Sequence, residues 1–230
     1  MKLISSLLFI IIMPFATIGQ DLCKGYFAHE EGSKWIMTTY DKNKKKSGSI
    51  SYEVLFNEVE AGENIITFTY EGKDEDDEEM YKGDFTGTCS NHTFTSSFSG
   101  LFGDAMPKTA DVEVEISGDF VQYPHTLKPG ESLPDANIVI ASKIEGGMTL
   151  LKVTSEISNR KVVGFEKIVT PAGTFDCVKI TYDAKIKMVI SKTVQVVEYM
   201  AQGIGIVRSE HYNKKGDLSG YSELSMWSKG

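Results

Sequence analysis

One run of alternating side chains most limits what this chain can fold into. Between residues 178 and 190 every even position is apolar, whereas the odd positions include lysine, threonine and aspartate; the apolar set is Val178, Ile180, Tyr182, Ala184, Ile186, Met188 and Ile190. A period of two is that of a β-strand with one covered and one wet face. At about 3.3 Å per residue the strand would reach about 43 Å, well beyond the usual length of about five or six residues. So long a strand has to twist, which predicts a curved sheet rather than a flat sandwich.

Shorter stretches alternate in the same way, among them 50–56, 112–116 and 151–157. Charged or Pro/Gly-containing turns separate the alternating stretches, and short connections favour neighbouring strands that pair in chain order. We therefore predict an all-β fold: a strongly curved antiparallel meander of about ten or eleven strands, forming a half-barrel or open barrel. The long strand 174–190 is expected near its middle, and the one helical candidate is a short segment around Thr95–Met106.

The N-terminus predicts export. Lys2 precedes an apolar stretch, Leu3–Met13, which is broken only by two serines and followed by small residues up to Gly19. This is the three-part pattern of a signal peptide, and the run is shorter than the about 20 apolar residues that a membrane-spanning helix needs. We predict a signal peptide over residues 1–19 and a single β domain over 20–230, with no transmembrane segment after cleavage. The mature domain is expected in the periplasm, outside the cell or on the cell surface.

The charge of the chain argues against nucleic acid as a partner. The sequence holds 24 basic and 32 acidic residues, a net charge of −8, and removal of residues 1–19 would take away one further lysine. An acidic chain without a basic stripe lacks the electrostatic surface that phosphate backbones require.

Three cysteines, Cys23, Cys89 and Cys177, follow the predicted signal peptide. An oxidising compartment favours a disulfide, and three cysteines allow one bridge and one spare thiol in three pairings; three buried thiols are the alternative. Because Cys177 follows a tight turn, where a bridge needs strict geometry, we favour Cys23 with Cys89.

No motif in the sequence indicates catalysis or metal binding. The four histidines have no H-x-x-x-H spacing, and no G-x-S-x-G turn occurs, although a triad can assemble from scattered positions. The acidic run Asp74–Glu79 lacks the pattern of a calcium loop and predicts a solvated loop tip. We predict no catalytic residue, no metal ligand and no cofactor.

The long strand supplies the candidate binding surface. A curved sheet with a row of apolar side chains either fills its own interior or leaves a cavity for an apolar ligand. The side chains expected on the concave face are Val178, Ile180, Tyr182, Ile186 and Met188.

Several segments resemble the TapB family of exported Bacteroidota proteins. The most similar are Asn159–Gly164, Thr170–Cys177 and Gly203–Val207, with further likeness at Pro129–Asp135 and Glu31–Trp35. The resemblance covers most of the mature chain and implies a periplasmic or surface β protein, related to a broader exported family of unknown function. It also implies, by fold analogy alone, a similarity to the half-barrels that carry lipoproteins.

Three functions are consistent with these features. The first is a non-enzymatic envelope binding protein whose concave face holds an apolar small molecule, a lipid or an envelope protein. The second is a protein-interaction subunit of an envelope assembly, acting through loops and edges. The third is an unrecognised hydrolase of envelope polymers.

Overall fold

The protein, described as a computed structural model over residues 25–96, 112–144, 148–188 and 190–230, is built from β-strands and their connections. Thirteen strands follow one another along the chain: β1 (Lys34–Asp41), β2 (Lys46–Glu60), β3 (Glu63–Lys73), β4 (Glu79–Ser90), β5 (Thr93–Ser96), β6 (Val112–Asp119), β7 (Val121–Pro124), β8 (Ala136–Ile144), β9 (Thr149–Thr170), β10 (Gly173–Lys187), β11 (Ser191–Ala201), β12 (Gly205–Tyr212) and β13 (Leu218–Ser228). No helix in these residues is long and apolar enough to cross a membrane.

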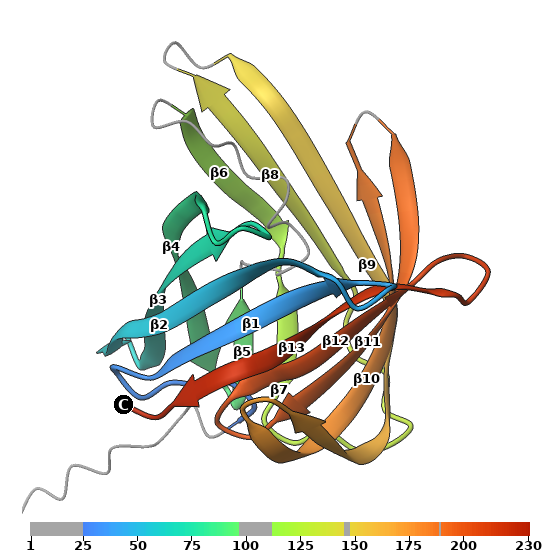
Figure 1. Cartoon of the computed structure of the whole chain (residues 1–230). Coiled ribbons are helices and arrows are strands. Elements are labelled where there is room, and N and C mark those ends of the chain that lie inside the picture. The colour runs from blue at the N-terminus through green and yellow to red at the C-terminus, as the bar shows by residue number, and fades with distance from the viewer. Residues whose placement is uncertain (1–24, 97–111, 145–147, 189) are drawn as a thin grey trace, which may run out of the picture.

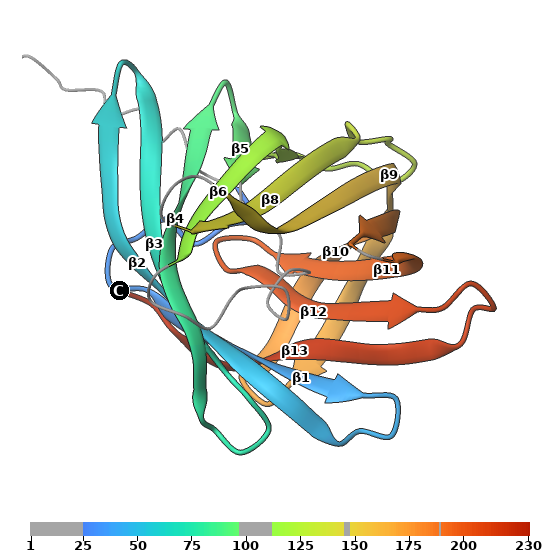
Figure 2. The ribbon, with the colours of Figure 1, turned by 90° about the horizontal axis from the view of Figure 1, so that it is seen from above.

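All thirteen strands belong to one antiparallel sheet that curves into a nearly closed barrel (Figures 1 and 2). The order across the sheet is β6-β8-β9-β10-β11-β12-β13-β1-β2-β3-β4-β5-β7. Apart from the exchange of β6 and β7 at its ends, this is a meander in which β13 returns to pair with β1. The prediction of an all-β, strongly curved meander is confirmed, with thirteen strands in place of ten or eleven.

The two edges of the sheet are joined by the chain itself. The edge strands β6 and β7 are consecutive in sequence, and only Phe120 separates the end of the first from the start of the second. They do not pair with each other in the sheet, so the barrel closes at this seam without a ladder of backbone hydrogen bonds. The sheet must therefore curl until its opposite edges meet.

A buried arginine bridges this seam. Arg160 lies on β9, near the β6 edge, and its side chain is only 2% exposed. Its Nη1 donates hydrogen bonds to the carbonyl oxygens of Gln122 on β7 (3.0 Å) and of Pro134 in the β7–β8 connection (2.9 Å). The same connection follows β9 closely, since Leu133 N donates to Arg160 O and Gly130 N to Val162 O. One guanidinium thus links strands from the two edges of the sheet.

The longest strand, β9, bends at two irregularities. Its register with β10 shifts beside Val163 and again beside Asn159, whose φ of 58° is uncommon for a non-glycine residue. Such β-bulges add a residue on one strand and increase the local twist. They let β9 follow the wall of the barrel, while its hairpin with β10 reaches β13, where Ala172 N donates to Leu224 O (3.3 Å).

Some element boundaries differ from the prediction. The long strand runs from Gly173 to Lys187, so Met188 and Ile190 lie beyond its end, and it is fourth from the β6 edge rather than central. Of the predicted helix 95–106, Thr95 and Ser96 belong to β5, and the remainder lies outside the described residues. The predicted signal peptide, residues 1–19, also lies outside them.

The bridging role of Arg160 predicts a large loss of stability when this side chain is replaced. Arg160→Met removes the donors of two backbone carbonyls and the nearest positive charge of the buried Glu198, so we expect the free energy of unfolding to fall by about 3–5 kcal/mol. Urea unfolding followed by circular dichroism measures it. The matched control is Lys167→Met on the same strand, whose pair with Asp176 is exposed at both side chains and should contribute no more than about 1 kcal/mol. Equal losses in the two variants would contradict the bridging role.

Candidate functional site

The interior of the barrel contains a partly open cavity of about 140 Å³. Its wall draws on both halves of the sheet, from Trp35 and Met37 on β1 to Tyr182 on β10 and Ser222 on β13. Residues far apart in the chain therefore meet around one interior space, and the cavity exists only because the sheet curls.

One side of the cavity is aromatic. Trp35 and Tyr52 are partners across β1 and β2 and stack with ring centroids 5.1 Å apart. Phe68 and Phe85, partners across β3 and β4, stack at 4.8 Å, and Trp35 meets Phe68 edge-on at 6.1 Å. Aromatic cross-strand pairs stabilise antiparallel sheets, and here two such pairs meet edge-on and form an apolar part of the cavity lining. These four residues, Trp35, Tyr52, Phe68 and Phe85, are called the aromatic wall below.

The same lining contains a buried carboxyl group. Glu198 on β11 is 5% exposed and accepts hydrogen bonds from the hydroxyl groups of Tyr182 (2.6 Å, to Oε1) and Tyr123 (3.3 Å, to Oε2). Burial raises the pKa of the Glu198 carboxyl above its ordinary value, although the two tyrosines and the charge of Arg160 act in the opposite direction. Burial and the nearby Glu198 also raise the pKa of Tyr182, which stays a hydrogen-bond donor at neutral pH.

Arg160 lies beside this group. Its Cζ sits 4.9 Å from the centre of the Tyr123 ring, a cation–π distance. Its Nη1 serves the two seam carbonyls, whereas Nε and Nη2 are buried and have no hydrogen-bond partner among the described residues. The four residues Arg160, Glu198, Tyr123 and Tyr182, called the polar group below, all line the same cavity as the aromatic wall.

A serine and a histidine also line the cavity. Ser209 Oγ lies 3.3 Å from His211 Nε2 on the same face of β12. Burial, followed by the charge of Lys192, lowers the pKa of His211, so its ring is neutral at physiological pH. A neutral imidazole beside a hydroxyl is the start of a nucleophile–base pair, although the described contacts include no carboxylate that orients the ring.

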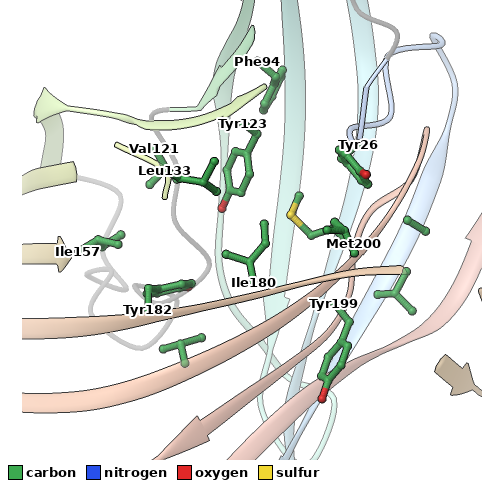
Figure 3. Close-up of a cluster of buried hydrophobic side chains, with 14 of the residues drawn as sticks. Tyr26, Phe94, Val121, Tyr123, Leu133, Ile157, Ile180, Tyr182, Tyr199 and Met200 are labelled. Atoms are coloured by element: carbon green, nitrogen blue, oxygen red, sulfur yellow. The ribbon is translucent and has the colours of Figure 1, made fainter. Parts of the chain in front are cut away.

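The five predicted binding residues fall into different environments. Val178, Ile180 and Tyr182 are buried, and Figure 3 shows Ile180 and Tyr182 in one cluster with Tyr123 and Met200. Tyr182 lines the cavity, whereas Val178 lines a separate open groove. Ile186 is partly buried, and Met188 is 47% exposed beyond the end of β10. The long strand thus supplies more packing than cavity surface.

Sequence reasoning missed the two charged members of the polar group. Glu198 interrupts an apolar inward series, Val194, Val196 and Met200, and a charge at such a position was the available signal. Arg160 gave no comparable signal, because the irregularity at Asn159 shifts the alternation of β9 just before it.

The cysteines occupy separate places. Cys89 is disulfide-bonded, and its predicted partner Cys23 lies outside the described residues. Cys177 is a free buried thiol that lines an open groove of about 580 Å³ near the β9–β10 hairpin, together with Tyr26, Phe165 and Phe175.

No cluster of three or more histidine, cysteine, aspartate or glutamate side chains suitable for a metal ion occurs in the described part of the chain. The available chemistry is therefore that of an apolar cavity with one buried cation, one buried acid and several hydroxyl groups.

The fold defines an all-β protein of a single curved sheet wrapped into a nearly closed barrel. The chain belongs to the DUF3108-like family, whose profile matches residues 30–224. No curated protein is significantly similar to it.

Two solved structures share this fold. A "putative exported protein with YmcC-like fold" from Bacteroides fragilis is 25% identical, with a TM-score of 0.77, and the match covers 90% of this chain and all of that one. A "putative lipoprotein" from Parabacteroides distasonis is 24% identical, with a TM-score of 0.75, over 90% of this chain and 99% of that one. The first description refers to an exported protein and the second to a lipoprotein, and neither names a ligand.

The raised pKa of Glu198 predicts a pH-dependent stability difference. Above the ordinary value of 4.5 the unfolded chain loses this proton more readily than the folded one, so ionisation opposes folding as the pH rises. Glu198→Gln cannot ionise, and we expect it to gain stability relative to the unmodified protein between about pH 4 and pH 7. Urea unfolding across this range tests it, with Glu58→Gln as the surface control. If the difference in unfolding free energy between Glu198→Gln and the unmodified protein does not change with pH, Glu198 titrates alike in the folded and unfolded states.

Cys177 should be unreactive in the folded protein. Burial, followed by the charges of Asp176 and Glu166, raises the pKa of its thiol from 9.0 to about 11, which lowers the thiolate fraction at neutral pH about 100-fold. Iodoacetamide labelling followed by mass spectrometry should therefore modify Cys177 at least about 100-fold more slowly in the native than in the urea-unfolded protein. Comparable rates would place the thiol in solvent.

Proposed function

We propose that this chain is a non-enzymatic protein of the cell envelope that binds a small amphipathic molecule inside its barrel. The observation that supports it is the cavity inside the barrel, whose lining combines the aromatic wall with the polar group. Ligand sites in proteins combine a mostly apolar lining with a few placed polar groups in the same way. The description of one structural relative as an exported protein and of the other as a lipoprotein supports the location. The narrower assignment to the TapB family stays a prediction.

The size of the cavity restricts the ligand. At about 140 Å³ it is close to the about 150 Å³ of an apolar cavity that accepts one benzene molecule, and below the about 300–1,000 Å³ of sites for larger ligands. An extended acyl chain would need more room than this volume offers. A small molecule with a body of about one ring therefore fits better than a lipid.

The proposal can be tested by filling the cavity. Ser222 lines it, and its hydroxyl contacts Thr39 Oγ1 at 2.9 Å, so Ser222→Phe places a ring in the space at the loss of one hydrogen bond. Native mass spectrometry of protein purified from its own envelope should show a small adduct, and Ser222→Phe should lose it.

The matched control is Ser219→Phe on the same strand, which adds the same ring at an exposed position and should keep the adduct. An adduct that persists in Ser222→Phe, or a protein free of adduct in all three forms, would refute the proposal.

A protein-interaction role is the second candidate. The β9 side of the hairpin exposes Phe165 (65%) and Val169 (72%), and apolar side chains of this size on a surface favour contact with another protein. Phe165→Glu should abolish capture of one stoichiometric envelope partner if the hairpin is the interface, and leave the cavity adduct intact.

A hydrolase is the third candidate, and it rests on the contact between Ser209 and His211. A nucleophilic serine would be labelled by a fluorophosphonate probe, and Ser209→Ala would abolish the label. Absence of labelling in the native protein favours the binding role.

A further inference from the structure

The structure leaves one edge of a buried guanidinium unpaired. Arg160 is 98% buried, yet of its three nitrogens only Nη1 has hydrogen-bond partners, the carbonyl oxygens of Gln122 and Pro134. Nε and Nη2 have no partner in the part of the chain that the structure describes. An unpaired polar group away from water is costly, and more so when it is charged.

The two unpaired atoms make a specific shape. Nη1 already donates to the carbonyl oxygens of Gln122 and Pro134. The two remaining nitrogens, Nε and Nη2, form the side-on edge of the guanidinium, where their N–H bonds are parallel. This edge matches the two oxygens of a carboxylate, which accept both hydrogen bonds at once.

Among the described residues, no side chain of the cavity supplies these oxygens. Glu198 is the one carboxylate in the described lining, and its oxygens accept from Tyr182 and Tyr123 rather than from Arg160. The hydroxyl groups of Tyr182 and Tyr123 thus occupy the oxygens of Glu198, and the Nε–Nη2 edge of Arg160 stays available to a ligand.

We propose that the ligand of this cavity is a small monocarboxylate, held side-on by Nε and Nη2 of Arg160, with its apolar body against the aromatic wall. This inference rests on the proposed function and names the chemical class of ligand. The cavity volume limits the body to about one aromatic ring or a short branched chain.

The test uses phenylacetate and two neutral counterparts of similar size, phenylacetamide and ethylbenzene. Both tryptophans report on the site, because Trp35 lines the cavity and Trp227 lies 6.2 Å from it between ring centroids. Titration followed by tryptophan fluorescence should give an affinity for phenylacetate at least about tenfold above that for phenylacetamide.

Two variants separate ligand binding from the structural role of Arg160. Arg160→Lys keeps a donor for the seam carbonyls but loses the parallel edge, so phenylacetate should bind at least about tenfold more weakly while ethylbenzene is unaffected. Glu198→Gln removes the opposing charge and should raise the affinity for phenylacetate about tenfold, again without effect on ethylbenzene. The second variant carries the test if the first does not fold.

The outcomes are distinct. Equal affinities for phenylacetate and phenylacetamide, with ethylbenzene still bound, would overturn the carboxylate inference and leave the cavity as a neutral apolar site whose arginine edge holds water. No binding of any of the three probes would overturn the proposed function as well.

Discussion

The rest of the structure depends on closing a sheet whose two edges are consecutive in the chain. Because β6 and β7 are separated by Phe120 alone, the sheet can exist only when it is curled far enough for its ends to meet. The seam has no ladder between the edges, so other groups have to satisfy its backbone carbonyls. Arg160 does this from β9, and its burial follows from that position.

The same side chain joins fold and function. A guanidinium has more donors than two carbonyls require, and Arg160, whose Nε and Nη2 are left over, lines the cavity with the other members of the polar group. Glu198 offsets the buried positive charge at a distance, while the two tyrosine hydroxyls occupy its oxygens. Arg160 can therefore bridge the seam through Nη1 and still offer Nε and Nη2 to a ligand. A variant that keeps the positive charge, such as Arg160→Lys, separates these two roles.

Alternation in the sequence predicted the strand that packs most regularly. Val178, Ile180 and Tyr182 face inward on β10 as the pattern requires, and the hairpin turns lie where charged or glycine-containing segments were seen. The four-residue strands β5 and β7 were too short to show a period, and their pairing depends on the far edge of the sheet. The bulges in β9 move the alternation out of phase just where Arg160 enters the interior. The polar group was therefore hidden, since it depends on contacts between β7, β9, β10 and β11 that local sequence does not encode.

The pairing of β1 with β13 has a kinetic consequence. The register from Lys34↔Ser228 to Asp41↔Gly220 joins the first strand to the last, so one side of β1 stays unpaired until the final residues of the chain have been synthesised. Contacts of such long sequence separation slow folding and leave apolar strands open to aggregation in the meantime. A chain of this design cannot complete its barrel while it is still emerging from the ribosome.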